Sequence, residues 1–162
     1  MICAKFYKDN YDLAEYAKAA EWCNSNNATI EDKGEYYEVV EIPPPSLEDV
    51  KTAKINELKS IRDTKEVEPV QTSKGIFDYD DKSRDRLAIA RQSLEDNPSV
   101  ESIVWTTADN QRVSMGIADF AAINGAAAVR SNSLHIKYNE LKQRVNAAQT
   151  VEEVEAIHWP ED

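Results

Sequence analysis

The stretch that decides the fold is IADFAAINGAAAVRSNSLHIKYNELKQRVNAA, residues 117–148, which has no proline and repeats apolar or small residues at alternating spacings of three and four. A single helix would place these residues on one face, as the a and d positions of successive heptads. They are Ile117, Phe120, Asn124, Ala127, Ser131, Leu134, Tyr138, Leu141, Val145 and Ala148. Such a helix is roughly 45–50 Å long, which exceeds the width of a small domain. We therefore expect other helices to pack along it.

Those helices belong either to another chain or to this one. We call the row of a and d residues the seam. Asn124 and Ser131 are polar at successive a positions, which costs stability in a coiled coil but fixes the register when such residues of two helices pair across the seam. The alternative is that the seam packs only against helices of its own chain, expected at 47–64 and 81–96, and the sequence does not choose between the two. The candidate partner or oligomer interface comprises Ile117, Phe120, Asn124, Ala127, Ser131, Leu134, Tyr138 and Leu141.

The N-terminal part of the chain predicts a small β-α-β-β module. Apolar residues alternate along 2–7, which indicates a half-buried strand. Asp12 can cap the helix that follows it. Two β-prone runs, 28–31 and 35–42, flank Gly34, which tolerates the positive φ of a hairpin turn.

Three consecutive prolines divide the chain. Pro43–Pro45 cannot donate the hydrogen bonds of a helix or a sheet, and they stiffen the backbone. We therefore expect a module over 1–42, a proline linker over 43–45, and a helix-rich domain over 46–162. The predicted fold class is α+β, with two short β-hairpins and the long helix of about 117–148 in the larger domain.

Local signals give the order of elements in that domain. We expect a helix to about Thr64, a hairpin turning at Lys74-Gly75, a helix capped by Asp80 or Asp81, a hairpin turning at 108–110, the long helix, and a short helix capped by Thr150.

The charge balance excludes several partners. The formal net charge is -11 and the pI is near 4.7, so nucleic acid and anionic membrane surfaces would be repelled. No apolar run approaches the roughly 18 residues that span a bilayer. We expect a chain that stays in a cytoplasm and binds neither nucleic acid nor a membrane.

The acidic stretch 78–85 is the nearest approach to a metal site. A calcium loop of the EF-hand kind needs oxygen ligands at alternate positions and a glycine at the sixth, but Lys82 and Ser83 stand there. Capping and the helix dipole explain carboxylates at a helix start without a ligand. The weak metal candidates are Asp78, Asp80, Asp81 and Asp85.

No catalytic set is recognisable in the sequence. His135 lies beside the seam and His158 near the C-terminus, and neither has a serine or cysteine at a family-specific spacing. The four glycines are isolated, which argues against a phosphate-binding loop. We expect no enzymatic activity and no cofactor.

Three stretches of the larger domain carry a family resemblance. They are IFDYDDKSRDRL, SIVWTTADNQRVSMGIADFAAI and AAQTVEEVEAI. Over about residues 54–159 the chain resembles the domain of unknown function 4376 family, which is carried by tailed phages and prophages, often within tail-fibre-associated proteins. The most specific part of the resemblance is the hairpin containing Trp105, Asp109 and Asn110.

The resemblance implies a non-enzymatic bacteriophage tail-associated protein, either a tail-fibre assembly chaperone or a structural adaptor. The implied partner is a tail fibre or another tail component, with a homo-oligomer as a further possibility. Such a protein would act in the host cytoplasm during assembly or stay in the virion tail. The net charge motivates one alternative, an acidic phage protein that binds and inhibits a host or defence enzyme.

Overall fold

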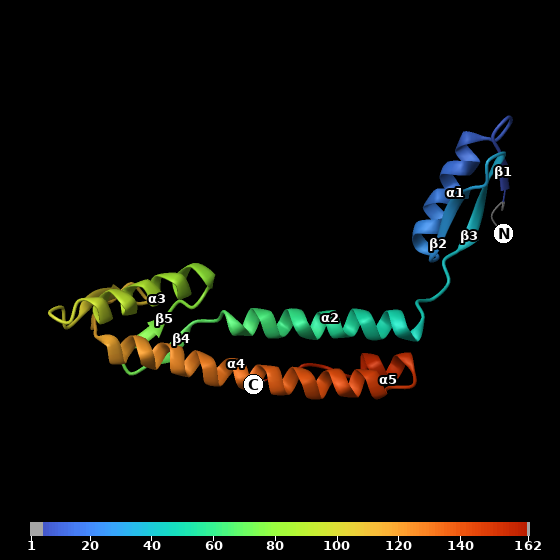
Figure 1. Cartoon of the computed structure of the whole chain (residues 1–162). Helices are drawn as coiled ribbons and strands as arrows, with labels where there is room; N and C mark the ends of the chain where they lie inside the picture. Colours follow the sequence, from blue (N-terminus) through green and yellow to red (C-terminus); the bar gives the residue numbers. More distant parts are fainter. Residues whose placement is uncertain (1–4, 162) are drawn as a thin grey trace. The chain divides into compact units, whose positions relative to one another are not determined.

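Three strands and one helix form the N-terminal unit, Met1–Ser46, in the computed structural model, which describes residues 5–161 (Figure 1). The elements in chain order are β1 (Lys5–Tyr7), α1 (Leu13–Ser25), β2 (Ala28–Asp32) and β3 (Tyr36–Glu41). The sheet is antiparallel with the order β1-β3-β2. The predicted β-α-β-β order is confirmed for these residues, whereas positions 2–4 of the predicted first strand lie outside the described residues.

Local hydrogen bonds fix the bounds of this unit's elements. The Asp12 carboxylate accepts hydrogen bonds from the backbone N–H groups of Ala14 (2.7 Å) and Glu15 (3.3 Å), so α1 begins where the sequence predicts. Gly34 has φ of +87° in the turn between β2 and β3, a conformation that glycine adopts without strain.

The second unit, Leu47–Asp162, is also α+β, as predicted. Its elements are α2 (Leu47–Glu66), β4 (Val70–Thr72), β5 (Gly75–Phe77), α3 (Asp81–Asp96), β6 (Ile103–Thr106), β7 (Arg112–Met115), α4 (Ile117–Ala147) and α5 (Val151–Glu155). β4 pairs with β5 and β6 pairs with β7, both antiparallel. The turn of the first hairpin lies one residue earlier than predicted, because Thr72 pairs with Gly75 and leaves Ser73-Lys74 as the two-residue turn.

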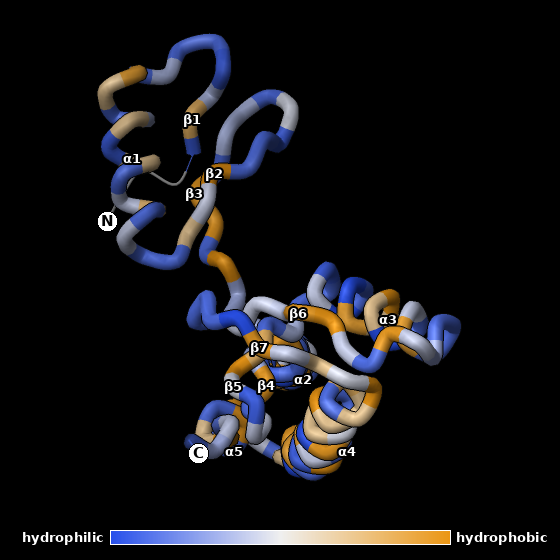
Figure 2. Tube along the Cα trace, turned by 90° about the vertical axis from the view of Figure 1, so that its left-hand side faces the viewer, coloured by the Kyte–Doolittle hydropathy of each residue, from blue (hydrophilic) through white to orange (hydrophobic). Residues whose placement is uncertain are grey.

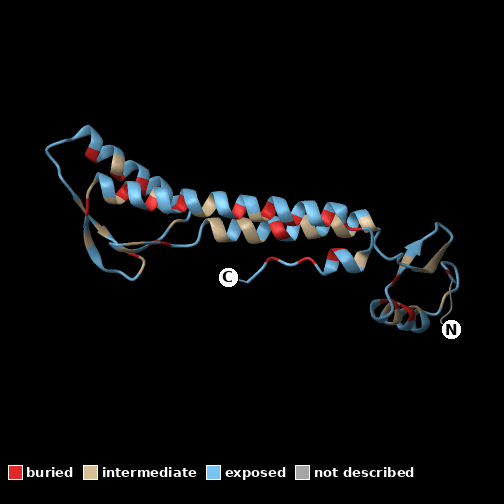
Figure 3. Ribbon diagram, turned by 90° about the horizontal axis from the view of Figure 1, so that it is seen from below, coloured by how far each residue is buried: buried red, intermediate tan, exposed pale blue. Residues whose placement is uncertain are grey.

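The long helix α4 contributes to two separate hydrophobic cores of this unit (Figures 1 and 3). α2 lies antiparallel to the second half of α4, since Lys51 Nζ bonds the Asn146 carbonyl and Glu66 bonds Ser131. The outer core lies along this pair and includes Leu58, Leu134, Tyr138, Leu141, Val145, Val154 and Trp159. The inner core lies along the first half of α4 and includes Val70, Phe77, Leu87, Leu94, Met115, Phe120, Ile123 and Ala127.

The buried face of α4 departs from a strict heptad in its first half. Ile123 is fully buried although it is neither an a nor a d position, and Ile117, the first predicted seam residue, is 42% exposed. A straight helix of 3.6 residues per turn drifts by about 20° per heptad from a 3.5-residue pattern. The heptad pattern therefore describes the half packed on α2 and fails near the start of the helix.

No helix among residues 5–161 is long and apolar enough to cross a membrane.

Ile123 and Ile136 test this register, because both are isoleucines of α4 but they are 0% and 53% exposed. Ile123→Ala should lower the free energy of unfolding by about 2–5 kcal/mol, because it leaves a cavity in the inner core. Ile136→Ala should change it by no more than about 0.5 kcal/mol. Urea denaturation followed by circular dichroism measures both, and equal effects would show that the buried face is wrong.

Candidate functional site

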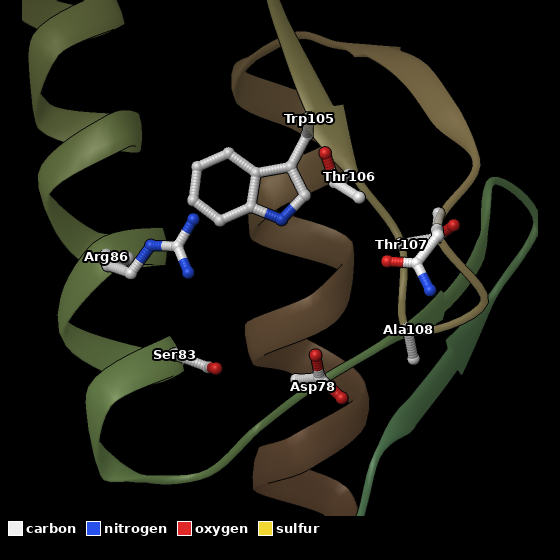
Figure 4. A pocket seen from close by; sticks show the side chains of 8 residues that line it. Asp78, Ser83, Arg86, Trp105, Thr106, Thr107 and Ala108 are labelled. Carbon is white, nitrogen blue, oxygen red and sulfur yellow. The ribbon is translucent and has the colours of Figure 1, made fainter.

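A pocket of about 260 Å³ lies between α3 and the loop that joins β6 to β7 (Figure 4). Its lining residues are Asp78, Ser83, Arg86, Trp105, Thr106, Thr107, Ala108 and Asn110. All of them belong to two of the stretches quoted above for the family resemblance, 76–87 and 102–123. Two segments that are separate in sequence therefore form one site.

The cap of α3 positions one wall of the pocket. The Asp80 carboxylate accepts a hydrogen bond from the Ser83 backbone N–H at 2.7 Å and starts the helix at Asp81. Ser83 and Arg86 are three residues apart, so they lie on the same side of α3 and both reach the pocket.

The β6–β7 loop forms the opposite wall and is held by the buried Thr107. The Thr107 hydroxyl donates to Asp109 and accepts from the Gln111 backbone N–H at 2.9 Å. Asn110 has φ of +62°, which asparagine tolerates in tight turns. The Ala108 N–H donates to the Ile76 carbonyl at 2.8 Å and so joins this loop to β5.

The pocket brings two opposite charges close to an indole ring. The Arg86 guanidinium lies 5.4 Å from the Trp105 ring centroid, within range of a cation–π contact. Trp105 also packs edge-to-face against Phe120: the two ring centroids are 5.4 Å apart and the ring planes form an angle of 85°. In the part of the chain that the structure describes, the side chains of Arg86 and Asp78 have no ion-pair or hydrogen-bond partner.

The four aspartates proposed as weak metal candidates do not converge. Asp80 caps α3, Asp81 pairs with Arg84, and Asp78 lines the pocket. Hydrogen bonds from the Ser83 backbone and side chain hold the pKa of Asp80 below its ordinary value. Among residues 5–161, no three His, Cys, Asp or Glu side chains are grouped as metal ligands.

A polar cluster on α4 separates the two cores. Glu66 Oε1 accepts a hydrogen bond from Ser131 Oγ at 2.7 Å and lies 3.0 Å from His135 Nε2. Arg130 donates to the carbonyls of Glu66 (2.8 Å) and Pro69 (3.0 Å). Because the Ser131 hydroxyl donates its hydrogen bond to the Glu66 carboxylate and not to the His135 imidazole, the cluster lacks the serine–histidine bond of an activated nucleophile.

Most of the predicted interface residues are covered by the chain's own helices. Phe120, Ala127, Leu134, Tyr138 and Leu141 are buried in the two cores. The remaining three, Ile117, Asn124 and Ser131, lie differently.

Ile117 is exposed, and Ser131 bonds Glu66. Asn124 and Ser131 line a second hollow of about 260 Å³, together with Glu66, Tyr79, Arg84, Ala127 and Ala128. A contact of these residues with another protein stays a prediction.

The outward face of α4 is the feature that the heptad analysis missed. Of its exposed side chains between residues 118 and 136, only His135 is titratable. The others are Ala118, Ala121, Ala122, Gly125, Ala126, Ala128, Val129, Asn132, Ser133 and Ile136. In Figure 2, α4 is seen nearly end-on, and orange and tan segments alternate with blue ones around its coil. The run of alanines was visible in the sequence, but only the packing shows which of them face outward.

Comparison with known proteins identifies one similarity. The family described as "Domain of unknown function (DUF4376)" matches residues 49–158, which is 110 of the 162 residues. The match contains the pocket, the polar cluster and the outward face of α4. No curated protein and no solved structure shows a match to the chain.

Asp80→Ala should lower the melting temperature of the second unit at pH 7, because α3 loses its cap. The pKa of Asp80 is lowered in the folded chain. The contribution of the Asp80 carboxylate to the stability of the fold is therefore complete above the ordinary aspartate pKa of about 3.9, and it is lost as the pH falls through the folded-state pKa. The deficit of Asp80→Ala should therefore disappear in acid. Asp85→Ala, on the same helix, is the control, and an equal deficit there would contradict the assignment.

Gly75→Ala should destabilise the second unit and displace the pocket loop. Gly75 has φ of +132°, and an added Cβ would lie 3.0 Å from Thr107 Cγ2. The backbone conformation alone should cost about 1–3 kcal/mol. Gly125→Ala is the matched control: its Cβ would meet nothing within 4 Å, so alanine should stabilise α4 by roughly 0.5–1 kcal/mol. Urea denaturation measures both, and similar effects would refute the distinction.

Proposed function

Because the chain belongs to the family described as "Domain of unknown function (DUF4376)", we propose that it is a non-enzymatic, bacteriophage tail-associated protein that acts as a tail-fibre assembly chaperone or a structural adaptor. The phage context follows from the resemblance of the stretches quoted above. The surface of the second unit supports a mode of action in which the chain binds another protein.

The observation that carries the proposal is the uncharged outward face of α4. Charged residues make up 30% of the chain, yet this exposed face carries only His135 as a titratable group over about five helical turns. An exposed patch of apolar residues on a helix is typical of a surface that binds a partner. Alanine and glycine at most of its exposed positions would allow a partner helix to approach closely.

Two larger side chains would anchor such a contact. Val129 is 70% and Ile136 53% exposed, and they lie seven residues apart on one side of α4. Burying a valine or isoleucine fully contributes about 1.5–3 kcal/mol. Two such anchors would supply a large part of the roughly 8 kcal/mol of a micromolar complex.

The mechanism differs between the two forms of the proposal. A chaperone would cover an apolar segment of the fibre through α4 until the fibre trimerises, and would then leave. An adaptor would keep the contact in the finished tail. Mass spectrometry of purified virions separates the two, because only the adaptor remains there.

Co-expression with a candidate tail-fibre protein tests the function. The fibre should be soluble and trimeric with the wild-type chain, and largely insoluble with Val129→Lys or Ile136→Lys. Each lysine places a charge on the proposed contact surface, while the cores stay intact. Ile89→Lys on α3 is the matched control, since Ile89 is also exposed, at 69%, and it should behave as the wild type.

A fibre that is equally soluble and trimeric without this protein would refute the chaperone. Retained binding by both α4 variants, with unchanged melting temperatures, would refute the α4 surface as the contact.

A further inference from the structure

We propose that the pocket between α3 and the β6–β7 loop binds the side-chain amide of an asparagine or glutamine in a partner protein. Arg86 would donate to the amide oxygen and Asp78 would accept from the amide NH₂. This site lies apart from the outward face of α4. It rests on the proposed function only in that its ligand is a protein segment.

The charges of the pocket favour a neutral ligand with a donor and an acceptor. Asp78 and Arg86 both line the pocket, and neither side chain has an ion-pair or hydrogen-bond partner among the described residues. A carboxylate ligand would meet Asp78, and an ammonium or guanidinium ligand would meet Arg86, so each would be repelled by one wall. A carboxamide carries an acceptor oxygen and a donor NH₂ a short distance apart and suits both walls.

The orientation of Trp105 favours a hydrogen-bonding ligand over a stacked ring. The indole already contacts the Arg86 guanidinium and the Phe120 ring. In Figure 4 its ring nitrogen points into the space bounded by Arg86, Asp78 and Ser83. The indole therefore offers the pocket its N–H group, a second donor for the amide oxygen.

The size of the pocket limits the ligand to one side chain. Its volume is about 260 Å³, below the roughly 300–1,000 Å³ of sites that enclose a drug-sized molecule. Ser83 and Asn110 line it as well, and they can complete the hydrogen bonds of an amide that enters. One residue of a partner segment would fill the space while the rest of the segment crosses the surface.

The test is an NMR titration of the full chain with acetylated and amidated pentapeptides Ala-Ala-X-Ala-Ala, where X is Gln, Asn, Leu, Glu or Lys. The readout is the indole N–H signal of Trp105, and the signals of Trp22 and Trp159, the other two tryptophans, are internal controls. The Gln or Asn peptide should shift the Trp105 signal alone with a Kd on the order of 1 mM. The Leu, Glu and Lys peptides should bind at least tenfold more weakly.

Two variants and two matched controls assign the contacts. Asp78→Asn and Arg86→Met should each weaken binding of the Gln or Asn peptide at least fivefold. Asp85→Asn and Arg112→Met change exposed residues outside the pocket and should leave it unchanged. All four positions are exposed, so the dispersed amide spectrum of the folded chain should persist.

Several results would overturn the proposal. They are an unmoved Trp105 signal with the Gln and Asn peptides, an equal response to the Leu peptide, and a stronger response to the Glu or Lys peptide. Failure here leaves the co-expression result for α4 standing. Conversely, if Val129→Lys and Ile136→Lys had no effect on the fibre, the α4 contact would be refuted but binding of the peptide to the pocket would not.

Discussion

The second unit depends on one helix, α4, that contributes to two separate hydrophobic cores. α4 presents Phe120, Ile123 and Ala127 to the inner core and Leu134, Leu141 and Val145 to the outer core. A shorter helix would leave one of these cores without a wall. The length of α4, 31 residues, therefore matches the two cores that it must reach. Among the described residues, no other element contributes to both cores.

The junction between the cores explains why the polar residue Ser131 interrupts the seam. Ser131 lies beside the C-terminal end of α2, where its hydroxyl and the His135 imidazole both contact the Glu66 carboxylate. The Arg130 guanidinium donates to the backbone carbonyls of Glu66 and Pro69. These groups are partly exposed, so we assign them little net stability. Their value is positional, because they fix where along α4 the end of α2 lies. The seam thus has an explanation within one chain, and the uncharged outward face is a separate feature.

Local rules predicted a large part of this structure. Asp12 and Asp80 cap helices and Gly34 takes a positive φ because each signal acts within a few residues. Ile123 was missed because the direction of α3 and the hairpins decides which side of α4 is covered. The pocket was missed for the same reason: Asp78 was noticed as a member of an acidic cluster, and only tertiary packing brings it to Trp105 and Arg86. The hairpin residues Asp109 and Asn110 were singled out through a resemblance, and the structure adds that Asp109 binds the Thr107 hydroxyl beneath the pocket loop.

The two cores are also nested along the chain, and this nesting bears on how the unit folds. The inner core is built from residues between Val70 and Ala127, whereas α2 and the second half of α4 flank that segment on both sides. The Glu66–Ser131 and Lys51–Asn146 bonds join positions 65 and 95 residues apart. Each doubling of a closed loop adds about 0.6 kcal/mol of entropy cost, so we expect the inner segment to condense first and bring the flanking helices together. Unfolding should follow the reverse order, so we expect α2 and α5 to unfold first, before the segment that they enclose.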